Sequence, residues 1–103
     1  MIKTIGTHNY YVYILTNQTK SVLYVGVSND LEQRLFSHQN PEVNSKSFTA
    51  KYRCFYLIYY ERFQNVEDAI RREKELKGWR RDKKDKLIIS FNQEWKFLNN
   101  EFE

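Results

Sequence analysis

The sequence has little cysteine, proline or glycine, and each shortage excludes a class of protein. Its 103 residues include one Cys, one Pro and three Gly. A single cysteine cannot form an internal disulfide, which excludes a disulfide-stapled secreted scaffold and favours a reducing compartment. So few prolines and glycines exclude a low-complexity or linker-rich chain. We therefore expect a folded globular protein.

Long apolar runs are also missing. No stretch reaches the length of a transmembrane helix, and residues 1–9 lack the apolar core of a signal peptide. We therefore expect a cytoplasmic protein that does not bind membranes. A chain of 103 residues can bury one hydrophobic core but not two. The sequence thus predicts one domain.

Aromatic residues and basic charge are, by contrast, abundant. Tyr, Phe and Trp make up 17% of the chain, and the formal net charge is +4 at pH 7. Residues 71–86 hold nine lysines and arginines, diluted by four acidic residues. Such a run is either a solvated helix face with internal salt bridges or an electrostatic footprint for phosphates. Charge alone leaves both interpretations open.

Runs of β-branched and aromatic residues predict three strands. Residues 10–16 and 22–27 are two such runs separated by turn-forming residues. Residues 52–63 have almost no polar interruption before Glu61, so we expect this run to be the central or most buried strand. Residues 40–51 include the proline and are predicted to form a loop.

Capping residues and periodicity predict two helices. Asn29 opens a sequence that resembles a capping box, so a helix is expected over about residues 30–39. Asn65 is predicted to cap a second helix over residues 66–77, which ends at Gly78. Together with the strands, these helices give a mixed α and β pattern.

Several polar residues fall on faces that should be apolar. Residues four apart share a helix face, and Arg34 and His38 fall among the leucines of the first helix. Glu73 falls near the middle of the inward stripe of the second helix. That stripe is predicted to consist of Val66, Ala69, Ile70 and Leu76. Tyr13 and Tyr24 likewise lie within the apolar strand runs.

Each of these residues also has an ordinary structural explanation. The tyrosines could pack with their hydroxyls at the rim of the core, and His38 could be half-buried against the backbone. Glu73 needs compensation, because a buried unpaired carboxylate is costly. It could pair with Arg34, reach water at the edge of the stripe, or line a cleft and hold a metal ion. Five such residues arriving together from a hairpin and two helices favour a functional site.

Other kinds of site find no support in the sequence. Two His and one Cys cannot supply a structural zinc site of the usual kind. The glycine-rich phosphate-binding and dinucleotide-binding motifs and the serine-esterase motif are missing.

The spacing of the polar residues resembles that of the GIY-YIG nuclease family. The letters YVY at 11–13 and YVG at 24–26 match its paired motif. The match continues through residues 29–38, and residues 69–88 are similar to the family's glutamate helix. The resemblance covers about residues 9–98 and is closest to the small stand-alone bacterial members. These are related to the catalytic N-terminal domain of the excision-repair endonuclease.

This resemblance implies an α+β fold, in which a small three-stranded antiparallel sheet is flanked by helices, as a single domain over residues 1–103. It also implies an endonuclease that hydrolyses phosphodiester bonds with one divalent ion, Mg²⁺ or Mn²⁺. The residues that match the family's catalytic positions are Tyr13, Tyr24, Arg34, His38 and Glu73. Among them, Glu73 matches the metal ligand and Arg34 the arginine at the scissile phosphate. His38 occupies a position held by histidine in some members and by tyrosine in others.

The sequence departs from the family pattern in three places. Tyr11 and Val12 replace the first Gly-Ile, and Asn92 is only a loose counterpart of a late asparagine. A lysine that often follows the second motif is missing, so proton removal falls to other groups. We expect Tyr13 to orient or activate the attacking water. His38, which titrates near neutral pH when unperturbed, is then the expected proton acceptor.

Within the basic run, the predicted nucleic-acid-binding residues are Lys77, Arg80, Arg81, Lys83 and Lys84. No base-reading motif is evident, so the sequence predicts cleavage directed by nucleic-acid structure rather than by base sequence. DNA is favoured over RNA as the substrate, in repair or processing, and an unknown protein partner could supply specificity. The alternative is a non-catalytic nucleic-acid-binding module that retains the fold.

Overall fold

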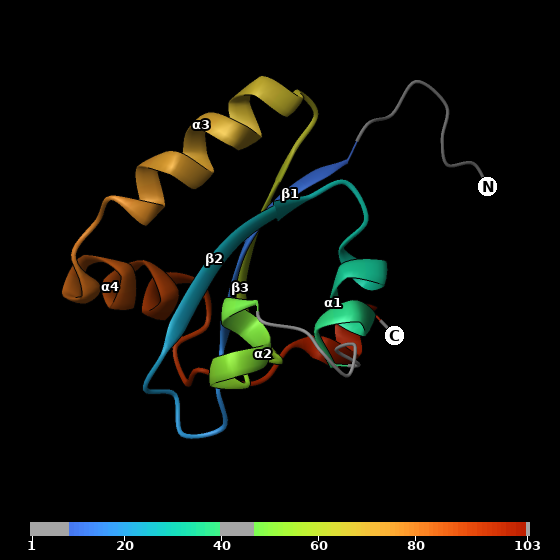
Figure 1. Cartoon of the computed structure of the whole chain (residues 1–103). Helices are drawn as coiled ribbons and strands as arrows, with labels where there is room; N and C mark the ends of the chain where they lie inside the picture. The colour runs from blue at the N-terminus through green and yellow to red at the C-terminus, as the bar shows by residue number, and fades with distance from the viewer. Residues whose placement is uncertain (1–8, 40–46, 103) are drawn as a thin grey trace.

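The computed structural model describes residues 9–39 and 47–102. Its elements are β1 (Tyr10–Thr16), β2 (Leu23–Ser28), α1 (Leu31–Gln39), α2 (Phe48–Tyr52), β3 (Tyr56–Phe63), α3 (Val66–Lys77), α4 (Arg81–Phe91) and the 3₁₀ helix η1 (Asn99–Phe102). The three strands form one antiparallel sheet in the order β2-β1-β3 (Figure 1). This arrangement confirms the predicted α+β class.

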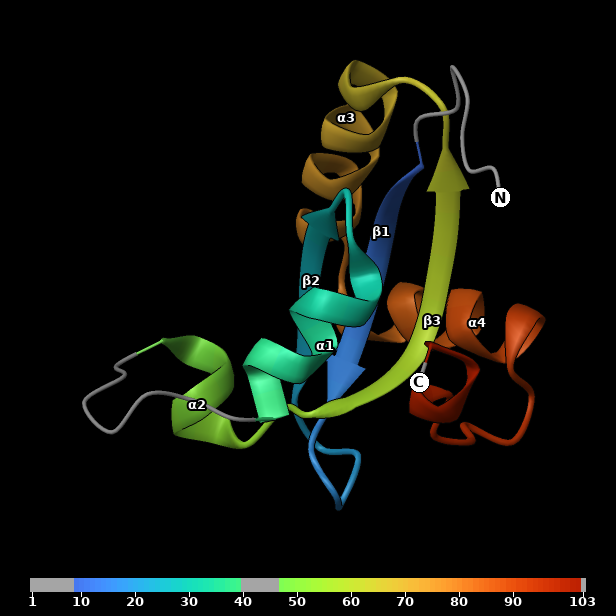
Figure 2. The same cartoon turned by 90° about the vertical axis from the view of Figure 1, so that its right-hand side faces the viewer.

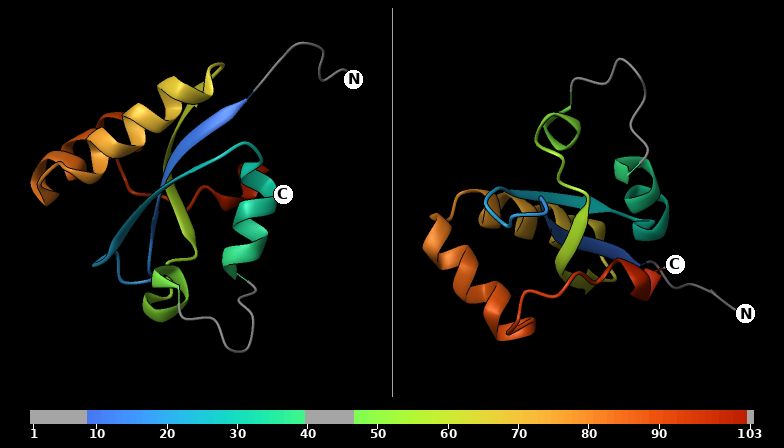
Figure 3. Two further views of the ribbon diagram at one scale, coloured as in Figure 1. Left: turned by 45° about the horizontal axis from the view of Figure 1, so that its top comes forward. Right: turned by 90° about the horizontal axis from the view of Figure 1, so that it is seen from below.

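Helices cover both faces of the sheet. Figure 1 shows α3 and α4 on one side and α1 with the C-terminal segment on the other, and Figure 3 shows the same layers from below. The short helix α2 projects beyond the β2 edge of the sheet (Figure 2). None of the helices in the described ranges is long and apolar enough to cross a membrane.

The alternation of side chains along the central strand β1 divides the core into two clusters. Val12 and Ile14 face α3 and α4, whereas Tyr13 and Leu15 face α1, and all four side chains are fully buried. The first cluster consists of Val12, Ile14, Val25, Ile58, Tyr59, Ala69, Leu76 and Ile88. The second consists of Tyr13, Leu15, Leu31, Leu35, Cys54 and Leu57. Period-two alternation thus places Val12 and Ile14 on the α3 side of the sheet and Tyr13 on the α1 side.

Three expectations about local structure were wrong. The third apolar run is the edge strand β3, not the central strand, and it begins at Tyr56. It is nevertheless well covered, partly because the C-terminal segment pairs with it through the amide of Leu98 and the carbonyl of Leu57, 2.7 Å apart. Part of the loop predicted over residues 40–51 is the helix α2, whereas residues 40–46 lie outside the described residues. Helix α1 is capped by Asp30, whose Oδ1 accepts from the amide of Gln33.

Helix α3 has the predicted bounds but a rotated inward face. Val66 and Ile70, expected to be buried, are 41% and 38% exposed. Arg72 instead turns inward, because its guanidinium binds both carboxylate oxygens of Glu61 on β3, at 3.0 and 2.9 Å. This bidentate ion pair holds one face of α3 against β3. Glu73 lies on the covered side of the helix, with 15% of its side chain exposed.

Candidate active site

The two motif tyrosines meet on the α1 face of the sheet because a glycine leaves room for them. Tyr13 on β1 lies directly opposite Gly26 on β2. A Cβ atom at Gly26 would lie 2.6 Å from Cζ and Oη of Tyr13 and 2.9 Å from Cε2 of Tyr24. With no side chain there, the two rings approach to 6.3 Å between centroids. The glycine of the second motif is therefore a requirement of close ring packing.

A short chain of polar contacts runs from Tyr13 through α1 to α2. The hydroxyl of Tyr13 lies 3.2 Å from Nε2 of His38, and Nδ1 of His38 lies 2.9 Å from Oγ1 of Thr49. With its hydrogen on Nδ1, the imidazole donates to Thr49 and accepts from Tyr13. Sequence reasoning missed Thr49, because α2 was expected to be a loop. The signal that could have found it is Ser47, whose side chain caps α2.

Charged groups from both sides of the sheet act on Tyr13. Complete burial raises the pKa of its phenol well above the ordinary value, and the neighbouring Tyr24 and the carboxylate of Glu73 add to the increase. The guanidinium of Arg34 opposes them, both through its charge and through a side-chain hydrogen bond. Tyr13 is therefore a neutral phenol that lies within the electrostatic reach of both Arg34 and Glu73.

His38 does not titrate near neutral pH, contrary to expectation. Burial lowers the pKa of its imidazole to about 4, and the nearby positive charge of Arg34 contributes in the same direction. At neutral pH the ring is consequently uncharged. A neutral imidazole is able to accept a proton, although the low pKa makes it a weaker base than a free histidine.

Glu73 has a partner that the sequence interpretation did not consider. Its Oε2 lies 2.9 Å from Nζ of Lys77, one helical turn further along α3. Arg34, the partner considered from sequence, is exposed, although it was expected on the inward face of α1. The Glu73–Lys77 pair is half-exposed on the lysine side, so it contributes little to stability.

The donor set at the site fits a hydrated hard cation. Among the residues that the structure describes, no group of three or more His, Cys, Asp or Glu side chains could enclose a metal ion. Glu73 thus provides a single carboxylate, with Oε1 left for an ion when Lys77 holds Oε2. Mg²⁺ commonly keeps several waters and binds through one or two carboxylates, whereas a structural zinc site needs four ligands.

One predicted nucleic-acid contact, Arg81, is engaged within the fold. Its guanidinium donates to the backbone carbonyls of Ser21 and Lys20 in the β1–β2 turn, at 2.9 and 3.1 Å. Its Nε also donates to Asp85 at 2.8 Å. Arg81 therefore ties α4 to the hairpin.

The other predicted basic residues are divided between ion pairs and solvent. Lys77 pairs with the site carboxylate, and the ammonium of Lys83 lies 4.2 Å from the centre of the Trp79 ring. Arg80 has 90% of its side chain exposed, while Lys84 is partly buried. Helix α4 lies on the side of the sheet away from α1 (Figure 1), whereas Tyr13 packs on the α1 side.

Asn92, the loose counterpart of the family's asparagine, has a structural role. Its amide nitrogen donates to the carbonyls of Ile58 and Lys96, and its oxygen accepts from the amide of Lys96. The side chain is 8% exposed and closes the end of α4. It takes no part in the contacts around Tyr13.

Fold and site together define a small α+β domain with paired tyrosines. The family model described as the GIY-YIG catalytic domain matches residues 9–86, and the chain belongs to this nuclease family. A UPF0213 protein of Bacillus pumilus is 37% identical over 81 residues, covering 79% of this chain and 80% of that protein. Another, from Clostridium perfringens, is 38% identical over 80 residues, covering 78% and 83%.

A solved structure supports the same assignment. The solution NMR structure of a UPF0213 protein from Bacillus halodurans matches with a TM-score of 0.52 and 29% sequence identity. The match covers 82% of this chain and 86% of that one. The names of these relatives state no reaction, so the family alone carries the inference to nucleic-acid chemistry.

Proposed function

We propose that this protein is a divalent-metal-dependent endonuclease that hydrolyses phosphodiester bonds at sites set by nucleic-acid structure. One observation carries the proposal. Tyr13 is fully buried, contacts His38, and has a pKa that responds to Arg34 and Glu73, which come from helices on opposite sides of the sheet. Family membership supplies the reaction class, and this convergence supplies the candidate groups.

Tyr13 and His38 would act as a proton relay. As water attacks the phosphate, Oη of Tyr13 would accept a proton from the water while passing its own proton to Nε2 of His38, 3.2 Å away. Because Tyr13 is fully buried, this step requires that substrate binding open access to its hydroxyl. A free phenolate, which burial strongly disfavours here, never forms. The resulting imidazolium lies near Arg34, so the relay becomes favourable only when an anionic phosphate is present to offset both charges.

Arg34 and Glu73 would act on the phosphate from two sides. The exposed guanidinium of Arg34 would contact a phosphate oxygen, where its charge stabilises the transition state. Glu73 would hold the divalent ion, with Lys77 yielding part of its contact. When bound, such an ion supplies positive charge to the phosphate and to the leaving oxygen.

The wider substrate assignment rests on charge and on what the site lacks. The exposed Arg80, with Lys83 and Lys84, would contact the nucleic-acid backbone at a distance from the reaction. No base-reading motif is evident in the sequence, which favours structural over sequence preference. We favour DNA over RNA, a role in repair or processing in the cytoplasm, and a partner that supplies specificity.

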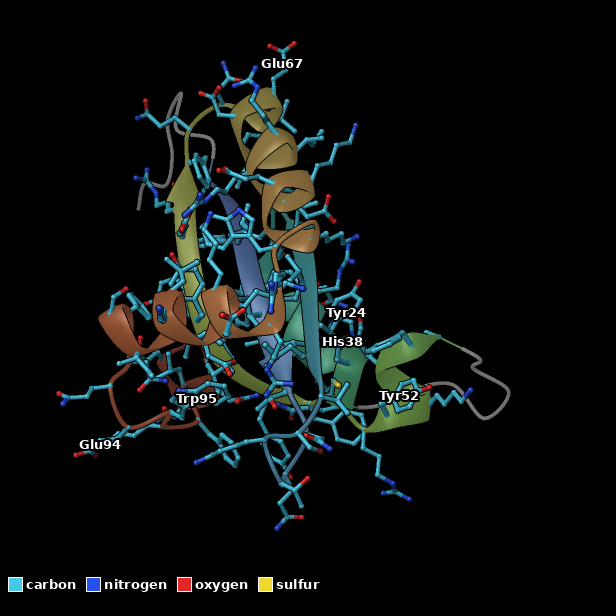
Figure 4. All side chains as sticks on the ribbon, turned by 90° about the vertical axis from the view of Figure 1, so that its left-hand side faces the viewer. Tyr24, His38, Tyr52, Glu67, Glu94 and Trp95 are labelled. Carbon is cyan, nitrogen blue, oxygen red and sulfur yellow. The ribbon has the colours of Figure 1, made fainter. Side chains whose placement is uncertain are left out.

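The test is cleavage of branched, single-stranded and duplex DNA by Glu73→Gln. We expect metal-dependent cleavage to fall at least about a thousandfold, because the sole candidate carboxylate ligand is lost. The melting temperature should barely change, since a half-exposed pair of this kind contributes less than about 1 kcal/mol. Glu67→Gln is the matched control, because Glu67 lies at the far end of α3 from Tyr24 and His38 (Figure 4).

Two outcomes would contradict the proposal. If Glu73→Gln cleaves as well as wild type, Glu73 is not the ligand. If wild type binds these substrates but cleaves none with Mg²⁺ or Mn²⁺, the protein is the non-catalytic binding module. The Glu73–Lys77 ion pair favours that alternative, because it already satisfies part of the carboxylate.

A further inference from the structure

A row of aromatic rings leads away from the candidate active site along α2. Tyr24, whose ring lies 5.7 Å from that of His38, stacks on Phe48 with a centroid distance of 5.9 Å and an interplanar angle of 30°. Phe48 in turn contacts Tyr52 at 4.6 Å. Figure 4 shows Tyr24 and His38 beside β2, with Tyr52 further out on α2. We call Phe48 and Tyr52 the α2 aromatic pair.

The two rings of the α2 aromatic pair are exposed to solvent, although α2 also has a buried side. Phe48 is 45% exposed and Tyr52 is 41% exposed, although α2 buries Thr49 and adjoins the buried Cys54. Phe36 on α1 is more exposed still, at 63%, but its ring is not one of those in this row. What distinguishes the pair is its direct stacking continuity with Tyr24.

Positive charge accompanies these rings. The ammonium of Lys51 lies 5.3 Å from the centre of the Tyr52 ring, and both residues are exposed. Arg53 follows immediately, also exposed, in a left-handed backbone conformation with φ of 58°. Helix α2 itself contains no acidic residue. Aromatic faces beside exposed cations are the combination that binds unpaired bases and their phosphates.

We propose that the α2 aromatic pair is a stacking platform for unpaired bases, with Lys51 and Arg53 contacting the adjoining backbone. Bases within a duplex already stack on one another, so the platform selects single-stranded or frayed nucleic acid. A strand stacked on Phe48 would continue directly to Tyr24 and the candidate phosphate site. The inference rests on the proposed function for that site and assigns single-stranded nucleic acid as its substrate class.

The test is the affinity of the double variant Phe48→Leu/Tyr52→Leu for a labelled oligothymidylate and for a duplex. Fluorescence anisotropy in EDTA measures binding without cleavage. Leucine keeps much of the bulk of both side chains but removes the aromatic faces. We expect single-strand affinity to fall about tenfold or more, and duplex affinity to stay within about twofold. Phe36→Leu, which removes an exposed ring outside the row, should leave both affinities unchanged.

Folding and function are separated by two further measurements. Should the double variant melt early, Tyr52→Leu alone repeats the test with the ring farthest along the row from Tyr24. An unchanged single-strand affinity, or an equal loss for single strand and duplex, would overturn the platform. If wild type cleaves and the affinity of the double variant for single strands is unchanged, the stacking proposal is wrong and the proposed nuclease function stands. If wild type does not cleave but the double variant selectively loses single-strand affinity, the nuclease proposal is wrong and the stacking proposal stands.

Discussion

Two buried tyrosines on opposite faces of the sheet have similar burial but different partners. Tyr13 is 0% exposed and Tyr59 is 4% exposed, and burial is the main cause of the raised pKa of each phenol. Tyr59 donates its hydroxyl hydrogen to Glu61, which Arg72 also binds. The hydroxyl of Tyr13 instead contacts a neutral imidazole.

The difference lies in where a proton could go. The bond to the Glu61 carboxylate raises the pKa of Tyr59 further, because loss of the proton would leave two anions side by side. For Tyr13, His38 offers an unprotonated nitrogen. An arginine favours the ionised phenol in both cases, Arg34 for Tyr13 and Arg72 for Tyr59, so the arginine is not what distinguishes them. Depth of burial therefore does not identify a reactive tyrosine; the chemistry of its partner does.

The largest expected difference between the two faces is in cleavage rate. Tyr13→Phe should reduce cleavage about 10²- to 10⁴-fold, the usual effect of removing a general acid–base group. Tyr59→Phe should leave cleavage unchanged and cost about 1 kcal/mol of stability, because Arg72 still satisfies Glu61. Single-turnover cleavage and urea unfolding measure the two effects. Equal cleavage by the two variants would assign Tyr13 to the core.

A smaller difference is expected between glycines associated with each face. Gly26→Ala forces a Cβ to within 2.6 Å of Tyr13, which should cost about 3 kcal/mol through overpacking and displace the phenol from His38. Gly78→Ala meets nothing nearer than 3.5 Å, at a φ of −83° that alanine adopts readily. It should therefore be neutral or slightly stabilising. Thermal melts of both variants check this, and comparable losses would contradict it.

The smallest expected effect is a pH dependence of the free energy of unfolding that arises from His38 on the α1 face. Because folding lowers the pKa of His38 from 6.5 to about 4, the unfolded chain binds a proton in this interval that the folded chain does not. Its contribution to stability is therefore complete above about pH 6.5 and is lost as the pH falls towards 4. At about pH 4.5 the loss should be about 2 kcal/mol.

His38→Gln separates this contribution from that of the carboxylates, which titrate in part of the same interval. The difference in unfolding free energy between wild type and His38→Gln should shrink by this amount between neutral pH and about pH 4.5. A pH-independent difference would mean that His38 has the same proton affinity folded and unfolded. Urea unfolding at the two pH values supplies the measurement.

Sequence reasoning succeeded where the determinants of structure are local. The helix over residues 66–77 was predicted with its bounds because Asn65 and Gly78 act within one turn of its ends. The position of β3 was wrong, because a long apolar run does not reveal that η1 and α4 cover an edge strand. Burial depends on segments more than thirty residues away, as the bond between the Leu57 carbonyl and Leu98 illustrates.

The candidate site was predicted as a set of residues but not as a set of contacts. Resemblance and face patterns named Tyr13, His38 and Glu73, and their catalytic roles remain predictions. The pairing of Glu73 with Lys77 could have been read from their i, i+4 spacing but was not considered. The low pKa of His38 depends on desolvation, which sequence spacing does not encode. Thr49 was missed for the same reason, since its contact with His38 spans eleven residues.

Cys54 is a chemical probe of local opening on the α1 face. Its side chain is fully buried beneath α2, its amide donates to the carbonyl of Thr49, and burial raises the pKa of its thiol to about 11. The thiolate, not the thiol, reacts with alkylating reagents. In the folded protein Cys54 is therefore protected both because reagents cannot reach it and because its thiol is not ionised. Since the chain has one cysteine, all thiol modification comes from this region. The alkylation rate therefore reports how readily the cluster around Cys54 opens.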